Sequence, residues 1–194
     1  MPPLDNGQPY EWGDAMNVAC QRRRVACAIV LALAVAGFGL FGFLGYARAQ
    51  IVAFGASNVA GKGVGSSEAF PAQLERLLAA KGYNVHVTNA GISGDTNAAL
   101  LARLDQAIPD GTKIVLLGTL GGSYNARRLG QGDQKAEYAA IVARLRSRGI
   151  KIIPVGAAGV TQSDMQADRT HLNGDGHAKL AARLLPSVIR ALGH

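Results

Sequence analysis

Short apolar runs alternate with longer amphipathic stretches through residues 50–194, and this alternation limits the possible folds more than any other feature of the sequence. The apolar runs predict four strands, at 51–55, 85–89, 113–118 and 150–155. The amphipathic stretches predict four helices, at 69–81, 96–107, 133–148 and 175–192. The helix at 175–192 is predicted to be kinked or restarted at Pro186. Strands that are apolar along nearly their whole length are typical of a parallel sheet covered on both faces, so we predict an α/β fold.

The functional groups of such a sheet gather beyond the carboxyl ends of its strands. We therefore expect the site in four loops, at 55–67, 90–95, 118–132 and 156–175. The last loop shows no pattern typical of a fifth strand, so we expect a small sheet.

Residues 1–49 form a separate segment in two parts. Residues 1–24 are polar and end in three arginines, and 25–47 contain no charged residue. With the Ala47-Arg48-Ala49 sequence, this pattern predicts an apolar helix at 25–49, either a signal peptide cleaved after Ala49 or an uncleaved membrane anchor. Both alternatives direct residues 50–194 outward, so we expect an exported, periplasmic or extracellular domain, held at the inner membrane if the anchor persists.

Composition narrows the possible partners. Both cysteines, Cys20 and Cys27, lie in the N-terminal segment, so the domain at 50–194 has no disulfide and no cysteine-based metal site. The formal charge is +7, but the basic residues are scattered and aromatic residues make up only 6% of the chain. We therefore expect no nucleic-acid partner.

Because a polar segment of 24 residues is long for a leader, we also hypothesise that translation starts at Met16.

The loop after the first predicted strand contains Ser57. Its glycines suggest a phosphate-binding loop, but position 56 is Ala and position 63 is Gly, where that motif needs Gly and then Ser or Thr. What remains is a serine just beyond a strand end, in a turn whose glycines let the backbone approach a ligand.

Two further loops supply groups that suit a serine nucleophile. Asp168 and His171 lie three residues apart in the last loop, and a histidine oriented by a carboxylate can take the proton of a serine hydroxyl. Gly94 precedes a predicted helix, so its backbone N–H could join that of Ser57 in stabilising an oxyanion. The other histidines, His86, His177 and His194, are predicted to be structural.

Four blocks of sequence occur in the same order as in a known family. They are Phe54-Gly55-Ala56-Ser57, then Asn89-x-Gly91-x-Ser93-Gly94-Asp95-Thr96, then Gly121-Gly122 with a nearby Asn, then Asp168-x-x-His171-Leu172. In these blocks the chain resembles the SGNH (GDSL-type) hydrolases, with closest similarity to the branch of acyl-CoA thioesterase I/lysophospholipase and arylesterases.

The resemblance covers nearly all of 50–194 and implies a flavodoxin-like, three-layer α/β/α sandwich. It implies Ser57 as nucleophile, His171 as base, Asp168 as the residue that orients it, and Gly94 as an oxyanion donor. The activity implied is hydrolysis of a small-molecule ester or thioester, with no cofactor and no metal.

The sequence departs from the family pattern at two places. Ala56 stands where the family usually has Asp, and the third block, usually Gly-x-Asn-Asp, reads Gly-Gly-Ser-Tyr-Asn. We expect Asn125 to supply the oxyanion-hole amide, with Ser123 as the alternative. The altered block also keeps open a second function, an exported acyl- or glycan-binding module on a catalytically decayed SGNH fold.

Overall fold

The computed structural model describes residues 50–132, 134–156 and 158–193. The predicted signal peptide or anchor at 25–49, its membrane contact through 25–47, the polar segment 1–24 and the proposed start at Met16 lie outside the described residues. Among the described residues, no helix combines the length and apolar character needed to cross a membrane.

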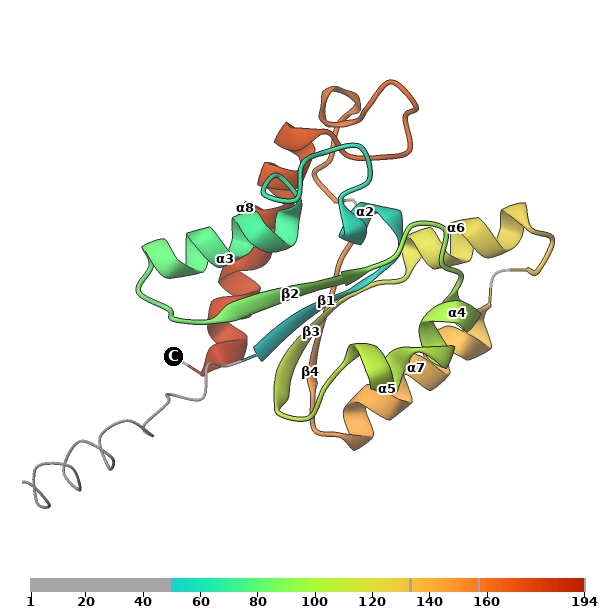
Figure 1. Cartoon of the computed structure of the whole chain (residues 1–194), viewed down its shortest axis with the longest axis horizontal. Coiled ribbons are helices and arrows are strands. Elements are labelled where there is room, and N and C mark those ends of the chain that lie inside the picture. The colour runs from blue at the N-terminus through green and yellow to red at the C-terminus, as the bar shows by residue number, and fades with distance from the viewer. Residues whose placement is uncertain (1–49, 133, 157, 194) are drawn as a thin grey trace, which may run out of the picture. The chain divides into compact units, whose positions relative to one another are not determined.

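Four parallel strands form the sheet at the centre of the domain (Figure 1). They lie in the order β2-β1-β3-β4 and have the bounds β1 Gln50–Gly55, β2 His86–Gly91, β3 Thr112–Gly118 and β4 Lys151–Pro154. All four were predicted from their apolar runs. β1 is flanked on its two sides by β2 and β3, so the chain reverses direction across the sheet at β1, and ligands bind at such a switch point.

Alternate residues of β1 face opposite layers. Ile51 and Ala53 pack in a core with α3 (Phe70–Ala80) and α8 (Gly174–Leu192). Val52 and Phe54 pack in a second core on the other face of the sheet. That face is covered by three helices, α4 Asn97–Ala102, α5 Leu104–Ala107 and α7 Lys135–Ser147 (Figure 1). The predicted α/β/α sandwich is thus confirmed.

Two of the predicted loops contain helices, which corrects the prediction. α2 (Ser57–Ala60) starts directly after β1, and α6 (Leu120–Arg128) starts after β3. The Gly121-Gly122 pair suggested a loop, but a Cβ at position 122 would lie 2.2 Å from Oδ1 of Asn97. Glycine is therefore used there to let α6 approach α4, an effect of tertiary packing that local pattern does not reveal. A short 3-10 helix, η1 Gln162–Asp164, lies in the last loop.

Two predicted helices also differ in continuity. The helix predicted at 96–107 is divided into α4 and α5 at Arg103, whose backbone has φ −102° and ψ 7°. α8 continues through Pro186 as one helix, so a restart there is wrong. Pro186 and Ala182, the residue four positions earlier, are both exposed, so water can bond the carbonyl that the proline cannot.

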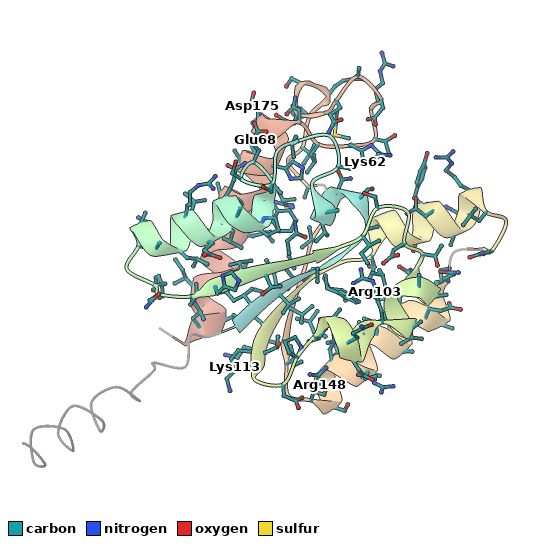
Figure 2. The ribbon with its side chains drawn as sticks, viewed as in Figure 1. Lys62, Glu68, Arg103, Lys113, Arg148 and Asp175 are labelled. Carbon is teal, nitrogen blue, oxygen red and sulfur yellow. The ribbon has the colours of Figure 1, made fainter. Side chains whose placement is uncertain are left out.

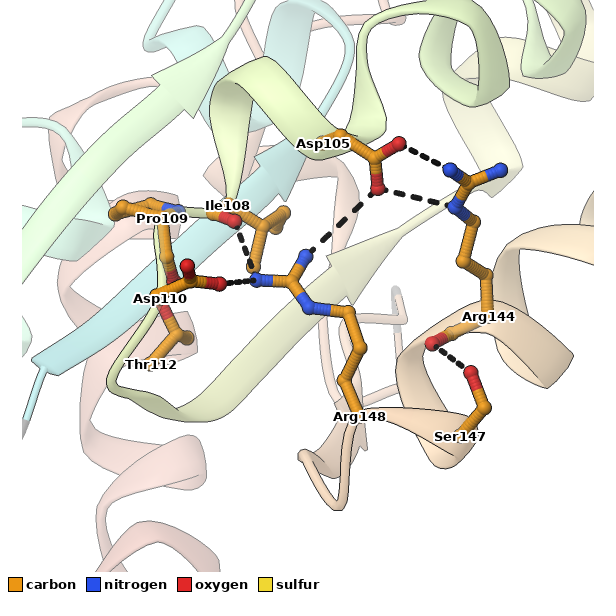
Figure 3. Close-up of polar contacts among 8 residues, drawn as sticks. All are labelled: Asp105, Ile108, Pro109, Asp110, Thr112, Arg144, Ser147 and Arg148. Carbon is orange, nitrogen blue, oxygen red and sulfur yellow. Dashed lines mark hydrogen bonds and ion pairs between the residues drawn. The ribbon is translucent and has the colours of Figure 1, made fainter.

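Arg144 of α7 and Arg148, the residue after its last one, pair with Asp105 in α5 and Asp110 after it (Figure 3). Arg144 Nε donates to Oδ1 of Asp105 at 3.0 Å, and its Nη2 bonds the other carboxylate oxygen. Arg148 Nη2 donates to the carbonyl of Ile108 at 2.7 Å and lies 3.5 Å from Oδ1 of Asp110. The charges of Arg144 and Arg148 are therefore partly neutralised by α5 and the turn after it.

Candidate active site

A cavity of about 440 Å³ lies beyond the carboxyl ends of β1, β2 and β3. Its lining includes Ser57 from α2, Gly94 from the β2–α4 turn, Asn125 from α6 and His171 from the loop before α8. These residues come from four separate segments of the chain, and the structure brings them to one cavity as the order of the strands requires.

Ser57 is the first residue of α2 and is buried, with 9% of its surface exposed. The N–H of a first helical residue has no acceptor within the helix, so that of Ser57 is available to a ligand. Ala56, the residue before it, is the N-cap and makes no side-chain hydrogen bond. The departure from the family pattern at position 56 thus leaves the start of α2 without a side-chain cap.

Asp168 takes part in three hydrogen bonds, two of them with His171. Nδ1 of His171 lies 2.5 Å from Oδ2 of Asp168, while Oδ1 accepts the backbone N–H groups of Thr170 at 2.9 Å and His171 at 3.0 Å. The side-chain bond to His171, followed by these two backbone bonds, holds the pKa of Asp168 well below its usual range. The carboxylate is therefore ionised at neutral pH and keeps the proton of the imidazole on Nδ1, which leaves Nε2 as the basic nitrogen.

The loop that carries His171 is closed at its base. Met165 and Leu172 form an antiparallel bridge, and the N–H of Gln166 donates to the carbonyl of His171 at 2.8 Å. The side chain of Gln166 donates to the carbonyls of Leu172 at 2.8 Å and Lys62 at 2.7 Å. Since Lys62 follows α2, this amide ties the loop to the segment that presents Ser57.

Asp164 anchors the same loop to α8. Its buried carboxylate accepts hydrogen bonds from Lys179 Nζ at 2.5 Å and from the backbone and hydroxyl of Thr161 at 2.8 and 2.7 Å. The bond to Lys179, then those to Thr161, lower the pKa of Asp164 to about 2. The loop is thus fixed on both sides of its tip.

Asn58 makes the most direct connection between the two halves of the site. Its Nδ2 donates to the carbonyl of Thr170 at 3.1 Å, and its Oδ1 accepts the N–H of Leu172 at 2.9 Å. These are the residues on either side of His171. Sequence reasoning missed this role, although the position of Asn58 directly after Ser57 is a signal that could have suggested it.

Gly94 and Asn125 face the cavity as a pair of polar groups. Gly94 has φ +91°, a left-handed conformation that favours glycine, and it is exposed. Asn125 Nδ2 donates to the carbonyl of Asp95 at 2.8 Å, so α6 is bonded to the turn that holds Gly94. Ser123, the alternative to Asn125, lies instead at a neighbouring cavity, where its Oγ accepts a hydrogen bond from Asn97 at 2.8 Å.

Arg103 contacts the turn that holds Gly94 (Figure 2). Its role was not predicted from the sequence. Its guanidinium lies 4.6 Å from the centroid of the Phe54 ring, and its Nε donates to Oδ2 of Asp95 at 2.7 Å. Nη2 donates to the carbonyls of Gly55 at 3.3 Å and Ala90 at 3.0 Å, at the ends of β1 and β2. One cation therefore holds two strand ends and the Gly94 turn together.

A second, apolar cavity of about 150 Å³ adjoins the first. The two share Asn58, Gly121 and Thr170 in their linings. The walls of the apolar cavity are mostly hydrophobic, with Val155, Val160, Met165, Leu172 and Leu180 among them. Ala56 also lines it, at the position where the family usually has a charged residue.

The described segments bear on two other kinds of site, a metal site and a site around a histidine other than His171. They contain no group of three or more His, Cys, Asp or Glu side chains arranged to hold a metal ion. His177 is buried in the core, where its Nδ1 accepts the N–H of Phe70 at 3.3 Å and its ring stacks on that of Phe70. Burial lowers the pKa of His177, against a smaller opposing effect of Glu68.

Comparison with known proteins identifies the family. The model of the GDSL-like Lipase/Acylhydrolase family matches residues 53–185. This chain belongs to the GDSL-like lipase/acylhydrolase family. The resemblance to GDSL-type hydrolases predicted from the four sequence blocks is therefore confirmed.

Individual proteins similar to this chain include two esterases. Esterase TesA of Pseudomonas aeruginosa is 31% identical over 110 residues, which cover 57% of this chain and 55% of that relative, so the chain matches little more than half of its length. The crystal structure of TesA matches with a TM-score of 0.63 and 24% identity, over 73% of this chain and 99% of that one. A psychrotrophic esterase EstA from Pseudoalteromonas sp., inhibited by monoethylphosphonate, matches with a TM-score of 0.56 and 16% identity, over 76% of this chain and all of that one. The two structures share the fold of this domain.

Proposed function

We propose that residues 50–194 hydrolyse carboxylic esters or thioesters through an acyl-enzyme formed on Ser57. The observation that carries this proposal is the convergence of Ser57 with the His171–Asp168 pair on one cavity, in a chain of the GDSL-like family. An ordinary serine hydroxyl is a poor nucleophile, and a neighbouring imidazole with a free basic nitrogen activates it.

The reaction follows from the groups in the cavity. Nε2 of His171 takes the proton of the Ser57 hydroxyl as Oγ attacks the carbonyl carbon, and the carbonyl oxygen becomes an oxyanion. The N–H groups of Ser57 and Gly94 and the second amide N–H of Asn125 stabilise that oxyanion. The imidazolium, stabilised by ionised Asp168, then protonates the departing alkoxide or thiolate.

The second half of the reaction repeats these steps with water. His171 takes a proton from water as the water oxygen attacks the acyl carbon of the acyl-enzyme. The tetrahedral intermediate collapses, the bond to Oγ breaks, and His171 returns the proton to Ser57. A carboxylic acid leaves and the enzyme is regenerated without a cofactor.

The apolar cavity beside Ser57 suits the acyl chain of the substrate. A cavity of about 150 Å³ lined by aliphatic side chains can hold a benzene molecule, which has six carbons. We therefore infer that acyl chains of up to about six carbons are preferred.

Hydrolysis of p-nitrophenyl butyrate tests the proposal. We expect Ser57→Ala and His171→Ala each to lower kcat/KM by at least about 10⁴-fold, while circular dichroism shows an unchanged fold. Ser66→Ala, which removes an exposed hydroxyl from the same connection, is the matched control and should keep full activity. Equal activity of the wild type and Ser57→Ala would exclude Ser57 as the nucleophile. Binding of esters without turnover by the wild type would favour the alternative function, an acyl- or glycan-binding module.

We further propose that the segment 25–49 exports this domain, either as a signal peptide or as a membrane anchor. The three arginines directly before it and its uncharged run of 23 residues support this proposal. Cell fractionation followed by N-terminal sequencing should find Gln50 as the first residue of a soluble exported form, or an intact leader in the membrane fraction. Recovery of the protein with its leader in the cytosol would contradict the proposal.

A further inference from the structure

The cavity that contains Ser57 and His171 is also lined by three cationic residues, Lys62, Arg128 and Arg169. All three are exposed. The described lining of this cavity includes no Asp or Glu. A concave site lined by charges of one sign concentrates ligands of the opposite sign.

The three cations come from separate segments, and local contacts hold each segment in place. Lys62 follows α2, and its carbonyl accepts the amide of Gln166 at 2.7 Å. Arg128 is the last residue of α6, with its guanidinium 5.9 Å from the ring centroid of Tyr124, which also lines the cavity. Arg169 has φ +53°, a left-handed conformation that is uncommon for a residue other than glycine. It lies between the two residues of the Asp168–His171 pair.

The nearby carboxylates are engaged elsewhere. Asp168 bonds His171, and Asp95 in the Gly94 turn bonds Arg103. Glu68, on the connection that follows Lys62, accepts the N–H of Gly65 at 2.8 Å. The described part of the chain shows no ion pair between a carboxylate and any of these three cations, whereas the cations Arg103, Arg144, Arg148 and Lys179 are all paired. The positive charge of the cavity is therefore available to a ligand.

We propose that Lys62, Arg128 and Arg169 form a subsite for an anionic group, a carboxylate or phosphate, carried by the alcohol or thiol part of the substrate. This inference rests on the proposed function of Ser57. None of the three cations is among the residues that line the apolar cavity, so the acyl chain and the anionic group occupy different spaces on the two sides of the ester. Guanidinium groups bind carboxylates and phosphates through paired N–H donors, and an ammonium group adds a point charge.

A pair of matched esters tests the subsite. 4-Nitrophenyl butyrate and 3-carboxy-4-nitrophenyl butyrate share the acyl chain and the reacting bond and differ by one carboxylate on the leaving group. We expect wild-type kcat/KM to be roughly three- to tenfold higher for the anionic ester at low salt. This is the effect expected when two or three exposed ion pairs form with the substrate, because each contributes little. This preference should fall towards one as NaCl screens the cations.

Substitutions locate the effect. The double variant Lys62→Gln/Arg128→Gln, which leaves only Arg169 of the three cations, should lower the preference to less than about twofold and leave kcat/KM for the neutral ester within about twofold of the wild type. The control, Lys81→Gln/Lys113→Gln, removes the same charge from two exposed lysines and should keep the preference. Figure 2 shows Lys113 at the end of the sheet opposite to Lys62. No preference in the wild type, or equal loss in the control, would overturn the subsite.

Binding measurements separate this inference from the proposed catalysis. The corresponding anilides of the two esters are not esters, and their affinity for the Ser57→Ala variant can be measured by calorimetry. We expect tighter binding of the carboxylated anilide, largely lost in Ser57→Ala/Lys62→Gln/Arg128→Gln. If neither ester is hydrolysed but this difference is found, the subsite holds and the catalytic proposal fails. Equal affinities for the two anilides would exclude the subsite whatever the catalytic result.

Discussion

The side-chain amide of Asn58 bonds the peptide groups on both sides of His171, by donating to the carbonyl of Thr170 and accepting the N–H of Leu172. Asn58 is the residue after Ser57, so the short helix that presents the hydroxyl also fixes the loop that presents the imidazole. The alignment of these two groups therefore depends in part on this one side chain, beside the bonds that Gln166 makes to the carbonyls of Lys62 and Leu172.

Removing this amide should reduce activity more than stability. We expect Asn58→Ala to lower kcat for p-nitrophenyl butyrate by about 100-fold, because a shift of about 1 Å in a catalytic group costs this much. Its free energy of unfolding should fall by about 1–3 kcal/mol, since the N–H of Leu172 loses its acceptor. Asn58→Asp keeps that acceptor and should retain more activity, and Asn84→Ala, at an exposed position, should match the wild type. Full activity of Asn58→Ala would contradict this role.

The ion pair between Arg103 and Asp95 should contribute more to stability than an exposed pair does. Their side chains are only 17% and 13% exposed, so Arg103→Met leaves a partly buried carboxylate without its cation. We expect a loss of about 3 kcal/mol in urea denaturation, largely recovered in Arg103→Met/Asp95→Asn. Arg144→Met, which breaks a pair that is 57% exposed on both sides, should lose less than about 1 kcal/mol. A similar loss of free energy of unfolding in Arg103→Met and Arg144→Met would show that burial does not determine how much these ion pairs contribute to stability.

Gly156 lines the apolar cavity, and a Cβ there would meet no other atom within 4 Å. Gly156→Leu should therefore fill space meant for the acyl chain without straining the backbone. Across a series of p-nitrophenyl esters, we expect kcat/KM for the hexanoate to fall more than about tenfold and that for the acetate to change less than threefold. Ala139→Leu, on an exposed position of α7, is the control. An unchanged chain-length profile in Gly156→Leu would place the acyl chain elsewhere.

Stability should fall between pH 7 and pH 5 because of His177. Burial lowers its pKa in the folded protein below the ordinary value of 6.5, so in this range the unfolded chain takes up a proton that the folded one does not. The free energy of unfolding therefore decreases as the pH falls below about 6.5. His177→Gln keeps an acceptor for the N–H of Phe70 and should show a flatter profile. If the profiles of the wild type and this variant coincide from pH 7 to 5, His177 does not contribute.

The free energy of unfolding should also fall in a second pH range, below the range in which His177 acts. The pKa values of Asp164 and Asp168 are lowered by their hydrogen bonds, so the stability they contribute is present above the ordinary aspartate value of 3.8. It is lost as the pH falls from there towards their folded values. The effect of His177 on the free energy of unfolding can thus be measured separately from that of Asp164 and Asp168.

The strands and the site segments were predictable because their signals are local. Apolar runs such as 113–118 belong to strands buried on both faces, and the Asp168–His171 spacing allows one loop to orient an imidazole. The helix α6 was not predictable, because Gly122 is explained by the approach of Asn97 from another helix and Gly121 by that of Ala56. The contacts of Asn58 and Arg103 were also missed, since each joins segments that are distant in the sequence and depends on where the backbone carbonyls finally lie.

The most direct test of the central claim, that His171 activates Ser57, is covalent labelling with a fluorophosphonate followed by peptide mass spectrometry. We predict one adduct, on Ser57, in the wild type and a loss of at least about 100-fold in labelling rate in His171→Ala. Labelling of Ser57 at the same rate in both proteins, or no adduct on Ser57 in the wild type, would contradict the account.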